Sequence, residues 1–443
     1  MGIKHVFSSE NICWQTGSVE TKTYEDTLKL TGKKKQTVKG FGGCFNEIAW
    51  DILQRVSGED RKAFFDELFM EENSNFTIGR VPIGANDFSL AWYSCDEVDN
   101  DYALDHFNID RDKTYTIPYI KEAMKRQLEL TLFASPWSPP TWMKTKKVYN
   151  YGTLRMEDQV LEAYARYFVK FVQAYENEGL QVGKVHVQNE PMADQKFPSC
   201  LWSGEQMRDF IKNYLGPAFE KSGMDTEIWV GTINGPFVDF MMGPGSAPFS
   251  EYYDQFENTI LCDKEARKYI TGLGFQWGGK HVIEQTVLSY PELRYMQTES
   301  ECGDGRNTWE HMEYVYRLMW HYFHHNVEGY MYWNMALPEG GISTWGWTQN
   351  SLVTVNEETL KVTYQPEFYL MKHFSHFVKK GAKVLETGGR WASNCVVFEN
   401  PDGQLVIIVG SNMNQAREFM FDHGDRSFSA RIEPHTIHTF IVD

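Results

Sequence analysis

The chain has 443 residues, of which 42% are hydrophobic and 23% are charged, and this amount of apolar material is enough to bury a large core. The 43 basic and 60 acidic residues give a net charge of −17, which argues against nucleic acid or an anionic membrane surface as a partner. The seven cysteines are scattered without a CxxC pair, so the sequence predicts neither a zinc ribbon nor a disulfide framework.

The sequence indicates neither a secretory leader nor a membrane span. The amino-terminal residues lead into polar sequence without an apolar segment, and there is no run of 18 apolar residues. We therefore expect a cytoplasmic protein without a membrane anchor, or a secreted protein if a leader has been removed. The composition leaves the oligomeric state open.

From about residue 38 to residue 335, short β-like runs alternate with longer helical stretches. In the helical stretches 156–178, 204–221 and 308–326, apolar residues recur every three or four positions. The β-like runs are 39–44, 76–83, 130–135, 184–190, 227–232, 272–277, 294–299 and 329–334. Eight strand–helix units are the number found in a (β/α)8 barrel.

An open, doubly wound parallel sheet is the alternative arrangement of such units. That fold usually carries a GxGxxG phosphate-binding loop after its first strand. Here the first run reads Gly40-Phe41-Gly42-Gly43-Cys44-Phe45 and lacks the final glycine. We therefore predict an α/β protein whose catalytic (β/α)8 TIM barrel covers residues 38–365.

Both ends of the chain have the pattern of a β-domain. Beyond about residue 376, the runs 396–398 and 405–409 flank the turn Asn400-Pro401-Asp402-Gly403 and predict a hairpin. Short strand-like runs continue from there to the C-terminus, and the first 35 residues are also strand-like. We expect a side β-sandwich domain formed from residues 1–37 and 366–443.

Candidate catalytic carboxylates lie where barrel strands end, which is where barrel enzymes carry their chemistry. The fourth predicted strand ends at Glu190 and the seventh at Glu299, so the two face each other across the barrel mouth. A retaining glycosidase needs such a pair about 5–5.5 Å apart, one as nucleophile and one as acid/base. Glu301 has the same strand parity as Glu299, so alternation alone does not choose between them. For each glutamate, a helix-capping or ion-paired carboxylate is the alternative interpretation.

Aromatic residues make up 15% of the chain and include 14 Trp. Indole rings pack on the C–H faces of sugars, so this excess suits a carbohydrate cleft, although filling a large core is the simpler explanation. The other candidates at the predicted strand ends are Arg80, Trp137, Trp142, Asn189, Gln276, Trp277, Trp333 and Asn334. Arg80 is either a structural ion-pair partner or the cation that keeps a nucleophile ionised. His321 and His325 are four residues apart but have no third ligand, so no metal site is predicted.

With these residues laid out, the chain resembles glycoside hydrolase family 30, which includes lysosomal glucosylceramidase and microbial β-1,6-glucanases. The resemblance runs from about Val38 to the C-terminus. It rests on the motifs 38–43 (VKGFGG), 80–83 (RVPI), 87–89 (DFS), 134–145 (ASPWSPPTWMKT), 188–191 (QNEP), 298–299 (TE), 333–337 (WNMAL) and 339–341 (EGG).

The resemblance implies a barrel with a side β-sandwich and a retaining, double-displacement mechanism that needs no metal or organic cofactor. By similarity, Glu190 is the acid/base, Glu299 is the nucleophile, and Arg80 matches the arginine beneath the nucleophile. The positions that hold the glycone in the family are matched by Asp87, Trp142, Asn189 and Trp333.

Two departures from the family pattern concern specificity. Where glucosylceramidase has His-Trp-Tyr, this chain has Gln276-Trp277-Gly278, which leaves space near the nucleophile. The segment 345–350 (WGWTQN) also differs, and we expect Trp345 and Trp347 to shape the aglycone side.

The expected partner is therefore a carbohydrate, and the expected reaction is hydrolysis of β-D-glucosidic linkages. We place β-1,6-linked gluco-oligosaccharides or glucan ahead of glucosylceramide-type β-glucosides. β-Xylosidase, β-fucosidase and β-1,6-galactanase activities are the alternatives within the family. A non-catalytic carbohydrate-binding protein is the alternative outside it.

Overall fold

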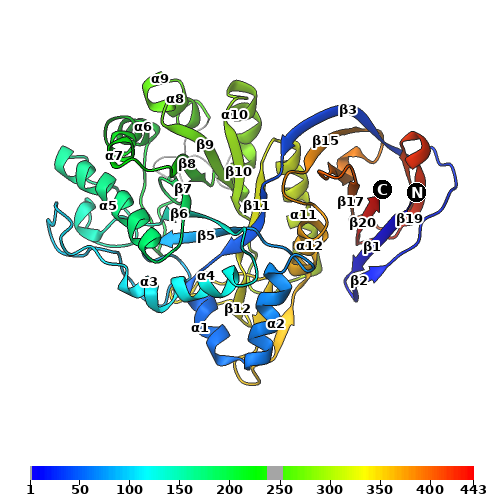
Figure 1. Cartoon of the computed structure of the whole chain (residues 1–443), viewed down its shortest axis with the longest axis horizontal. Coiled ribbons are helices and arrows are strands. Elements are labelled where there is room, and N and C mark those ends of the chain that lie inside the picture. Colours follow the sequence, from blue (N-terminus) through cyan, green and yellow to red (C-terminus); the bar gives the residue numbers. More distant parts are fainter. Residues whose placement is uncertain (1, 237–252) are drawn as a thin grey trace.

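Two β-sheets organise the fold (Figure 1). The computed structural model describes residues 2–236 and 253–443. The middle of the chain supplies an eight-stranded parallel sheet, and its two ends supply a nine-stranded sheet beside it. The predicted (β/α)8 barrel with a side β-domain built from both termini is therefore confirmed.

The parallel sheet runs in the order β10-β9-β8-β7-β6-β5-β4-β11. Its strands are β4 (Gly40–Cys44), β5 (Ile78–Ile83), β6 (Thr131–Pro136), β7 (Val182–His186), β8 (Glu227–Ile233), β9 (Ile270–Gln276), β10 (Arg294–Glu299) and β11 (Gly329–Asn334). Between β10 and β11, the N–H of Ser300 donates to the carbonyl of Met331 at 3.0 Å. This bond closes the sheet into a barrel. Three short strands follow: β12 (Ala336–Pro338), β13 (Val353–Val355) and β14 (Val362–Tyr364).

Helices follow the barrel strands and cover the outside of the barrel (Figure 1). They are α1 (Glu47–Arg55), α2 (Gly58–Phe69), α3 (Asp110–Thr114), α4 (Thr116–Met124), α5 (Asp158–Asn177), α6 (Gly204–Phe210), α7 (Gly216–Ser222), α8 (Glu257–Leu261), α9 (Lys264–Arg267), α10 (Ile283–Ser289), α11 (Trp309–His324) and α12 (Pro366–Ser375). Within the described ranges, none of the helices is long and apolar enough to cross a membrane.

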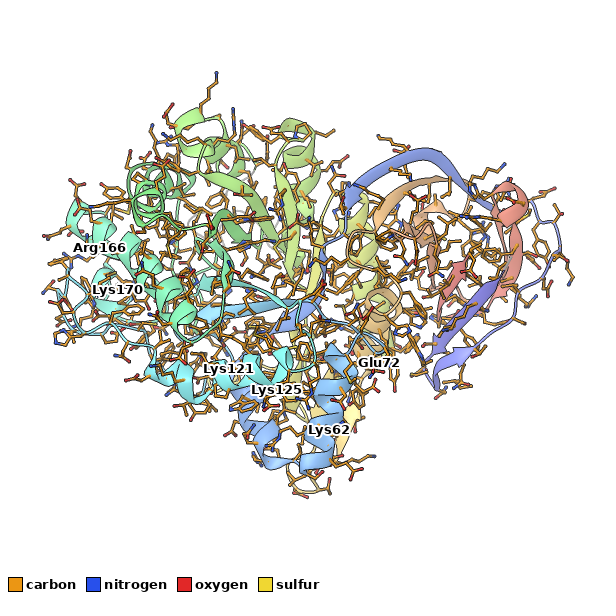
Figure 2. The ribbon with its side chains drawn as sticks, in the orientation of Figure 1. Lys62, Glu72, Lys121, Lys125, Arg166 and Lys170 are labelled. Atoms are coloured by element: carbon orange, nitrogen blue, oxygen red, sulfur yellow. The ribbon has the colours of Figure 1, made fainter. Side chains whose placement is uncertain are left out.

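The sequence periodicity of the outer helices matches their burial. On α5, Tyr164 and Phe168 are four residues apart and both are buried, because residues at this spacing share one helix face. The opposite faces carry charge: Lys62 on α2, Lys121 on α4 and Arg166 on α5 are exposed (Figure 2).

Large side chains fill the barrel interior. Ile78, Phe133, Trp229, Met296 and Met331 form one buried cluster and come from β5, β6, β8, β10 and β11. Inward-pointing residues of this kind form packed layers in such barrels. Residues further along the same strands therefore lie nearer the carboxyl ends, at the barrel mouth.

The fourth barrel strand is shorter than the sequence pattern predicts. The pattern gives a strand over 184–190, whereas β7 ends at His186. Glu190 has a φ of 47° and precedes Pro191, and neither residue suits a regular parallel ladder. The N–H of Glu190 instead donates to the Thr232 carbonyl at 2.9 Å, which holds this segment against the end of β8.

The second sheet joins the two ends of the chain in the order β19-β18-β3-β15-β16-β17-β20-β1-β2. Its strands are β1 (Ile3–Ser9), β2 (Ile12–Thr16), β3 (Thr27–Thr37), β15 (Lys383–Gly388), β16 (Cys395–Glu399), β17 (Leu405–Ser411), β18 (Arg417–Asp422), β19 (Phe428–Ile432) and β20 (Thr436–Val442). Ile3 pairs with Val442 in the β1–β20 ladder. Phe419, Phe428 and Phe440 pack together in the core of this domain.

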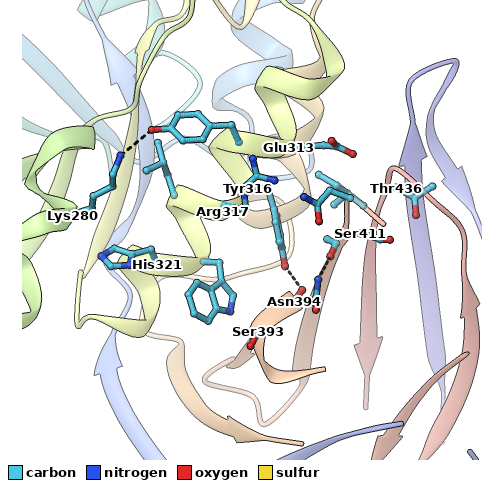
Figure 3. Close-up of a pocket in the computed structure, with 15 residues that line it drawn as sticks. Lys280, Glu313, Tyr316, Arg317, His321, Ser393, Asn394, Ser411 and Thr436 are labelled. Atoms are coloured by element: carbon cyan, nitrogen blue, oxygen red, sulfur yellow. Dashed lines mark hydrogen bonds between the residues drawn. The ribbon is translucent and has the colours of Figure 1, made fainter. Parts of the chain in front are cut away.

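Helix α11, together with α12, packs against the β-domain. The hydroxyl oxygen of Tyr316 lies 2.6 Å from the Asn394 carbonyl and 3.2 Å from the Ile408 carbonyl. A cavity of about 410 Å³ lies beside this contact, between α11 and strands β17 and β20 (Figure 3). Gly410 permits the close approach, because a Cβ there would lie 2.2 Å from Cε1 of Tyr316.

A charged cluster ties the chain beyond β10 to helices α11 and α12. Nε2 of His311 lies 2.5 Å from Glu301, and its Nδ1 lies 3.1 Å from Glu367. Burial lowers the pKa of His311, but hydrogen bonds to the two glutamates outweigh this effect and raise the pKa to about 9. The Asn350 amide donates to Glu367 at 2.7 Å, which joins the loop between β12 and β13 to the same cluster.

Replacing Gly410 by Ala should lower the free energy of unfolding by about 1–3 kcal/mol, the usual effect of overfilling a packed contact. Strand β17 or helix α11 would have to shift to admit the added carbon. Chemical unfolding of the two proteins measures the difference. Gly58→Ala is the control, because nothing lies within 4 Å of a Cβ at that position. An equal loss in the control would contradict the packing explanation.

The charged form of His311 should make stability depend on pH. An unfolded histidine has a pKa of about 6.5, so the stabilisation is complete below that pH and is lost as pH rises through the folded pKa of about 9. We expect the free energy of unfolding to fall by up to about 3 kcal/mol across this window. Urea unfolding at a series of pH values measures this decrease. In His311→Gln, the free energy of unfolding should depend less on pH across the same window. An unchanged slope in that variant would refute the assignment.

Candidate active site

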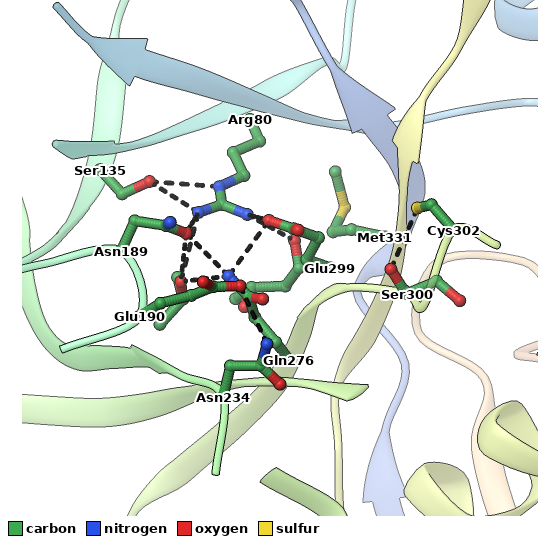
Figure 4. Close-up of polar contacts among 12 residues, drawn as sticks. Arg80, Ser135, Asn189, Glu190, Asn234, Gln276, Glu299, Ser300, Cys302 and Met331 are labelled. Carbon is green, nitrogen blue, oxygen red and sulfur yellow. Dashed lines mark hydrogen bonds and ion pairs between the residues drawn. The ribbon is translucent and has the colours of Figure 1, made fainter. Parts of the chain in front are cut away.

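Arg80 lies at the centre of the barrel mouth. It is two residues beyond Ile78, whose side chain fills the interior, so strand alternation directs Arg80 inward as well. Its side chain is 1% exposed. Nη1 donates to Oε2 of Glu299 at 2.5 Å, Nη2 donates to Oδ1 of Asn189 at 2.6 Å, and Nε donates to Oγ of Ser135 at 3.1 Å (Figure 4). One buried guanidinium therefore connects groups from β6, β10 and the chain beyond β7.

Two tryptophan rings pack against this guanidinium. Its Cζ lies 4.5 Å from the ring centre of Trp137 and 5.2 Å from that of Trp333, and the two rings are 5.1 Å apart. Cation–π contact offsets part of the desolvation of the guanidinium. The structure thus brings both tryptophans together with Arg80.

A β-bulge directs the Glu299 side chain into the mouth. Met296 faces the interior, so strict alternation would turn Thr298 inward and Glu299 outward. The β9–β10 pairing is irregular between Gln297 and Glu299, and an irregularity of this kind redirects the side chains that follow it. Nε2 of Gln276 donates to Oε2 of Glu299 at 3.1 Å. This amide and the guanidinium converge on one oxygen and leave Oε1 available for chemistry.

Glu190 lies beside this cluster, on the chain beyond β7. The N–H of Asn189 donates to the Pro136 carbonyl at 2.8 Å, and Oε1 of Glu190 accepts a hydrogen bond from Nδ2 of Asn234 at 2.9 Å (Figure 4). A left-handed backbone at a non-glycine residue costs about 1–3 kcal/mol and persists only where its surroundings hold it. Such strain is concentrated at functional sites.

Three carboxyl groups share this region with one cation. Burial raises the pKa of Glu190, while the Asn234 hydrogen bond and the charge of Arg80 lower it. Burial raises the pKa of Asp87 to about 7, and the charge of Glu190 contributes to this rise. Burial, together with the charges of Glu190 and Asp87, raises the pKa of Glu299 well above its usual value, although direct contact with Arg80 opposes this rise. Of the three carboxyl groups, Glu299 forms the ion pair with Arg80, and this contact favours the ionised form of Glu299 over that of Glu190.

Two polar side chains of the cluster have unused bonding capacity. Oδ1 of Asp87 is buried and has no hydrogen-bond partner among the described residues. Asn189 uses its Oδ1 for three donors, Arg80 among them, so its Nδ2 is left for another acceptor. Buried polar groups are normally satisfied, so we expect these atoms to meet the hydroxyl groups of a ligand.

Two of the sequence-derived candidates lie outside the cluster. Trp142 is buried, and its Nε1 donates to the carbonyl of Asp96 at 3.1 Å, so its N–H is already used within the protein. Trp277 is half-buried, with Nζ of Lys280 5.4 Å from its ring centre. Neither ring packs against the guanidinium.

Asn334, the last residue of β11, anchors the loop between β12 and β13. Its Nδ2 donates to Oε1 of Gln349 at 2.9 Å. Nearer the middle of the loop, Oγ1 of Thr344 donates to the Ser89 carbonyl at 2.6 Å. Because Ser89 is two residues from Asp87, these bonds hold the loop close to the cluster.

The loops after β5, β6 and β12 carry a group of aromatic residues, Trp92, Tyr149, Trp345 and Trp347, which we call the aromatic rim. Trp345 stacks on Trp92 with ring centres 4.2 Å apart and an interplanar angle of 4°. Tyr149 stacks on Trp92 at 5.5 Å. Trp347 is 39% exposed, and Nζ of Lys196 lies 5.5 Å from its ring centre. The rim therefore offers accessible indole surface at the carboxyl side of the barrel.

Two residues of the site were not identified as candidates from the sequence, although they also lie at a strand end. Thr232 and Asn234 lie at and just beyond the end of β8. Apart from the first barrel strand, β8 is the one strand whose end supplied no candidate residue in the sequence analysis. Examining the predicted end of β8 in the same way as the other strand ends would have identified both residues. Trp92 lies well beyond β5, and no local pattern marks it.

Glu301 has different surroundings from Glu299. Its carboxylate contacts His311 in the charged cluster described above, whereas Glu299 is 7% exposed and contacts Arg80. The structure therefore distinguishes Glu299 from Glu301, which strand alternation alone could not do.

His321 and His325 have ring centres 4.2 Å apart on and just beyond α11. Across residues 2–236 and 253–443, no group of three or more His, Cys, Asp or Glu side chains is arranged to hold a metal ion. The two histidines lack the further ligands that a structural or catalytic zinc site requires.

Comparison with known proteins agrees with this geometry. The profile of the glycosyl hydrolase family 30 TIM-barrel domain matches residues 38–378, and that of the family 30 β-sandwich domain matches residues 381–440. The chain is 30% identical to lysosomal acid glucosylceramidase of Mus musculus over 460 residues, covering 96% of this chain and 85% of the relative. It is 25% identical to an endo-1,6-β-D-glucanase of Neurospora crassa, covering 86% of this chain and 81% of the relative.

A solved structure, the endo-β1,6-glucanase BT3312, superposes with a TM-score of 0.84 at 25% identity, covering 99% of this chain and 98% of that one. The two family profiles together span the barrel and the β-domain. The chain therefore belongs to glycosyl hydrolase family 30 and is a glycoside hydrolase.

Proposed function

We propose that this enzyme hydrolyses β-D-glucosidic linkages with retention of configuration, using Glu299 as nucleophile and Glu190 as acid/base. The observation that carries the proposal is the convergence of Arg80 and Gln276 on Oε2 of Glu299, beside a Glu190 whose pKa is raised by burial. Double displacement requires two carboxyl groups that differ in protonation state at one site.

In the first step, Oε1 of Glu299 attacks the anomeric carbon, and the bond from that carbon to the glycosidic oxygen breaks. Glu190 gives its proton to the departing oxygen. Arg80 and Gln276 remain on Oε2, which orients the carboxylate so that Oε1 can attack.

In the second step, water attacks the anomeric carbon and gives its proton to Glu190, while the ester bond to Glu299 breaks. Esterification has removed the charge of Glu299, so an ionised Glu190 no longer faces a second carboxylate there. Glu190 is then suited to act as a base, and the restored Glu299 carboxylate returns to its ion pair with Arg80.

The glycone position is supported by polar atoms that have no hydrogen-bond partner within residues 2–236 and 253–443. Oδ1 of Asp87 and Nδ2 of Asn189 can each bond a sugar hydroxyl. A glucose unit is proposed because the relatives are named glucosylceramidase and endo-1,6-β-D-glucanase, and both names refer to glucose-containing substrates.

The aromatic rim supports a saccharide on the leaving-group side. Trp347 exposes indole surface next to Nζ of Lys196; a sugar ring can stack on such an indole, and the ammonium group can donate to sugar hydroxyls. We therefore propose β-1,6-linked gluco-oligosaccharides or glucan as substrates, ahead of glucosylceramide-type β-glucosides.

Glu299→Gln and Glu190→Gln should each lower kcat by several orders of magnitude on a β-1,6-linked gluco-oligosaccharide, because each removes a group that takes part in bond making. Glu301→Gln is the matched control and should keep kcat within about threefold, since Glu301 contacts His311 and not Arg80. NMR of the wild-type reaction should show the β-anomer first. Initial release of the α-anomer would exclude double displacement.

Trp347→Ala should lower kcat/KM about tenfold on a β-1,6-linked gluco-oligosaccharide, the loss expected for one stacking contact. Hydrolysis of a nitrophenyl β-glucoside, which has no second sugar, should change much less. Leu288→Ala, at an exposed apolar residue of α10, is the control. A wild-type preference for glucosylceramide over the saccharide would contradict the assignment of the leaving group.

A further inference from the structure

The side chain of Asn234 connects Glu190 to the chain that follows β9. Its Nδ2 donates to Oε1 of Glu190 at 2.9 Å, and its Oδ1 accepts a hydrogen bond from the backbone N–H of Gly278 at 2.8 Å. Asn234 is 5% exposed. The connection therefore spans the ends of three neighbouring strands, β7, β8 and β9 (Figure 4).

The backbone of Gly278 determines which way the Asn234 amide faces. A backbone N–H can only donate a hydrogen bond, so the amide atom opposite Gly278 must be the oxygen. The NH₂ group then has to face Glu190. A flipped amide would place two donors against each other at Gly278 and two acceptors against each other whenever Glu190 is ionised.

We propose that Asn234 is a positioning residue that determines which oxygen of Glu190 carries the catalytic proton. An NH₂ group can only donate, so Oε1 of Glu190 is the acceptor whether the carboxyl group is protonated or ionised. The proton is thereby confined to Oε2. This inference rests on the acid/base role proposed for Glu190 above.

The consequence for the reaction is that Oε2 carries out both proton transfers. In the first half-reaction, the Oε2–H bond breaks and the proton moves to the glycosidic oxygen as that oxygen leaves the anomeric carbon. In the second, an O–H bond of water breaks and its proton moves to Oε2 as the water oxygen bonds to the anomeric carbon. Asn234 holds Oε1 throughout, so the carboxyl group of Glu190 need not rotate between the two steps.

Asn234 also affects how readily Glu190 gives up its proton. Among the described residues, the charged groups facing Glu190 are Arg80 on β5, Asp87 beyond β5 and Glu299 on β10. Burial raises the pKa of Glu190, whereas the Asn234 hydrogen bond and Arg80 lower it. The two carboxylates repel its charged form. Asn234 therefore supplies a neutral donor that makes the base form accessible in the second step.

Two variants at Asn234 test this role. Asn234→Ala removes the donor, and Asn234→Asp has nearly the same shape but places an oxygen against Glu190. Asn400→Ala is the matched control, because Asn400 is 2% exposed and lies in the β-domain, where its Nδ2 donates to the Phe377 carbonyl. If Asn234→Ala does not fold, Asn234→Asp carries the test.

The first readout is the pH dependence of kcat/KM on a β-1,6-linked gluco-oligosaccharide. Loss of the donor destabilises the ionised form of Glu190, so its pKa rises and the acid form persists to higher pH. The alkaline limb should move up by about one pH unit in Asn234→Ala, and further in Asn234→Asp. Unchanged limbs in both variants would overturn the proposal.

The second readout is the dependence on the leaving group. Dinitrophenolate leaves without protonation, so kcat/KM on dinitrophenyl β-glucoside should fall by less than about threefold in Asn234→Ala, while kcat/KM on the oligosaccharide falls at least about tenfold. Equal losses on the two substrates would show a general structural role and would overturn the proposal.

The third readout does not depend on turnover. The ¹³C NMR signal of the Glu190 carboxyl group, assigned by its absence in Glu190→Gln, should titrate at higher pH in both Asn234 variants than in wild type or Asn400→Ala. Equal titration in all four would overturn the role of Asn234. A wild-type enzyme that cleaves no β-glucoside would refute the proposed function instead, and this titration would still decide the Asn234 assignment.

Discussion

The burial of one guanidinium group governs the barrel mouth. Arg80 is almost completely removed from water, and an unpaired cation there would be very costly. The strand ends therefore supply its acceptors, which are Ser135, Asn189, Thr232, the Thr298 carbonyl and Glu299. Only Glu299 among them is ionisable, and this contact favours its ionised form. Removing one partner of a buried ion pair typically costs about 3–5 kcal/mol, so the carboxylate proposed for chemistry also stabilises the fold.

The barrel and the positions of its key carboxyl groups could be predicted because both follow from strand periodicity. The predicted strands 294–299 and 329–334 coincide with β10 and β11, since barrel strands are nearly continuous apolar runs. Glu190 and Glu299 could be located because they lie at or just beyond strand ends. The direction of Glu299 could not be derived from alternation, because the β-bulge beside it shifts the phase by one residue and leaves no mark in the sequence.

Residues whose roles depend on tertiary contacts were harder to predict. Trp137 and Trp142 occur in one motif with similar local surroundings, yet only Trp137 packs on the guanidinium, while the N–H of Trp142 is bonded to a backbone carbonyl. Trp92 acquires its place in the aromatic rim from Trp345, which is distant in sequence. The orientation of Asn234 depends on a backbone N–H that any residue at position 278 other than proline would supply, so residue identity gives no signal for it.

The pairing of the two chain ends affects the order in which the protein can assemble. β1 lies against β20, and β3 lies against β15 and β18. Apart from the β1–β2 pairing, strands β1 and β3 therefore have no neighbouring strand until residues 383–442 have been synthesised. Contacts so distant in sequence carry a large loop-closure entropy, which the intervening barrel reduces once it has folded and brought the two ends together. Strand β3 and the second edge of β1 are thus among the last parts of the fold to gain the protection of a sheet.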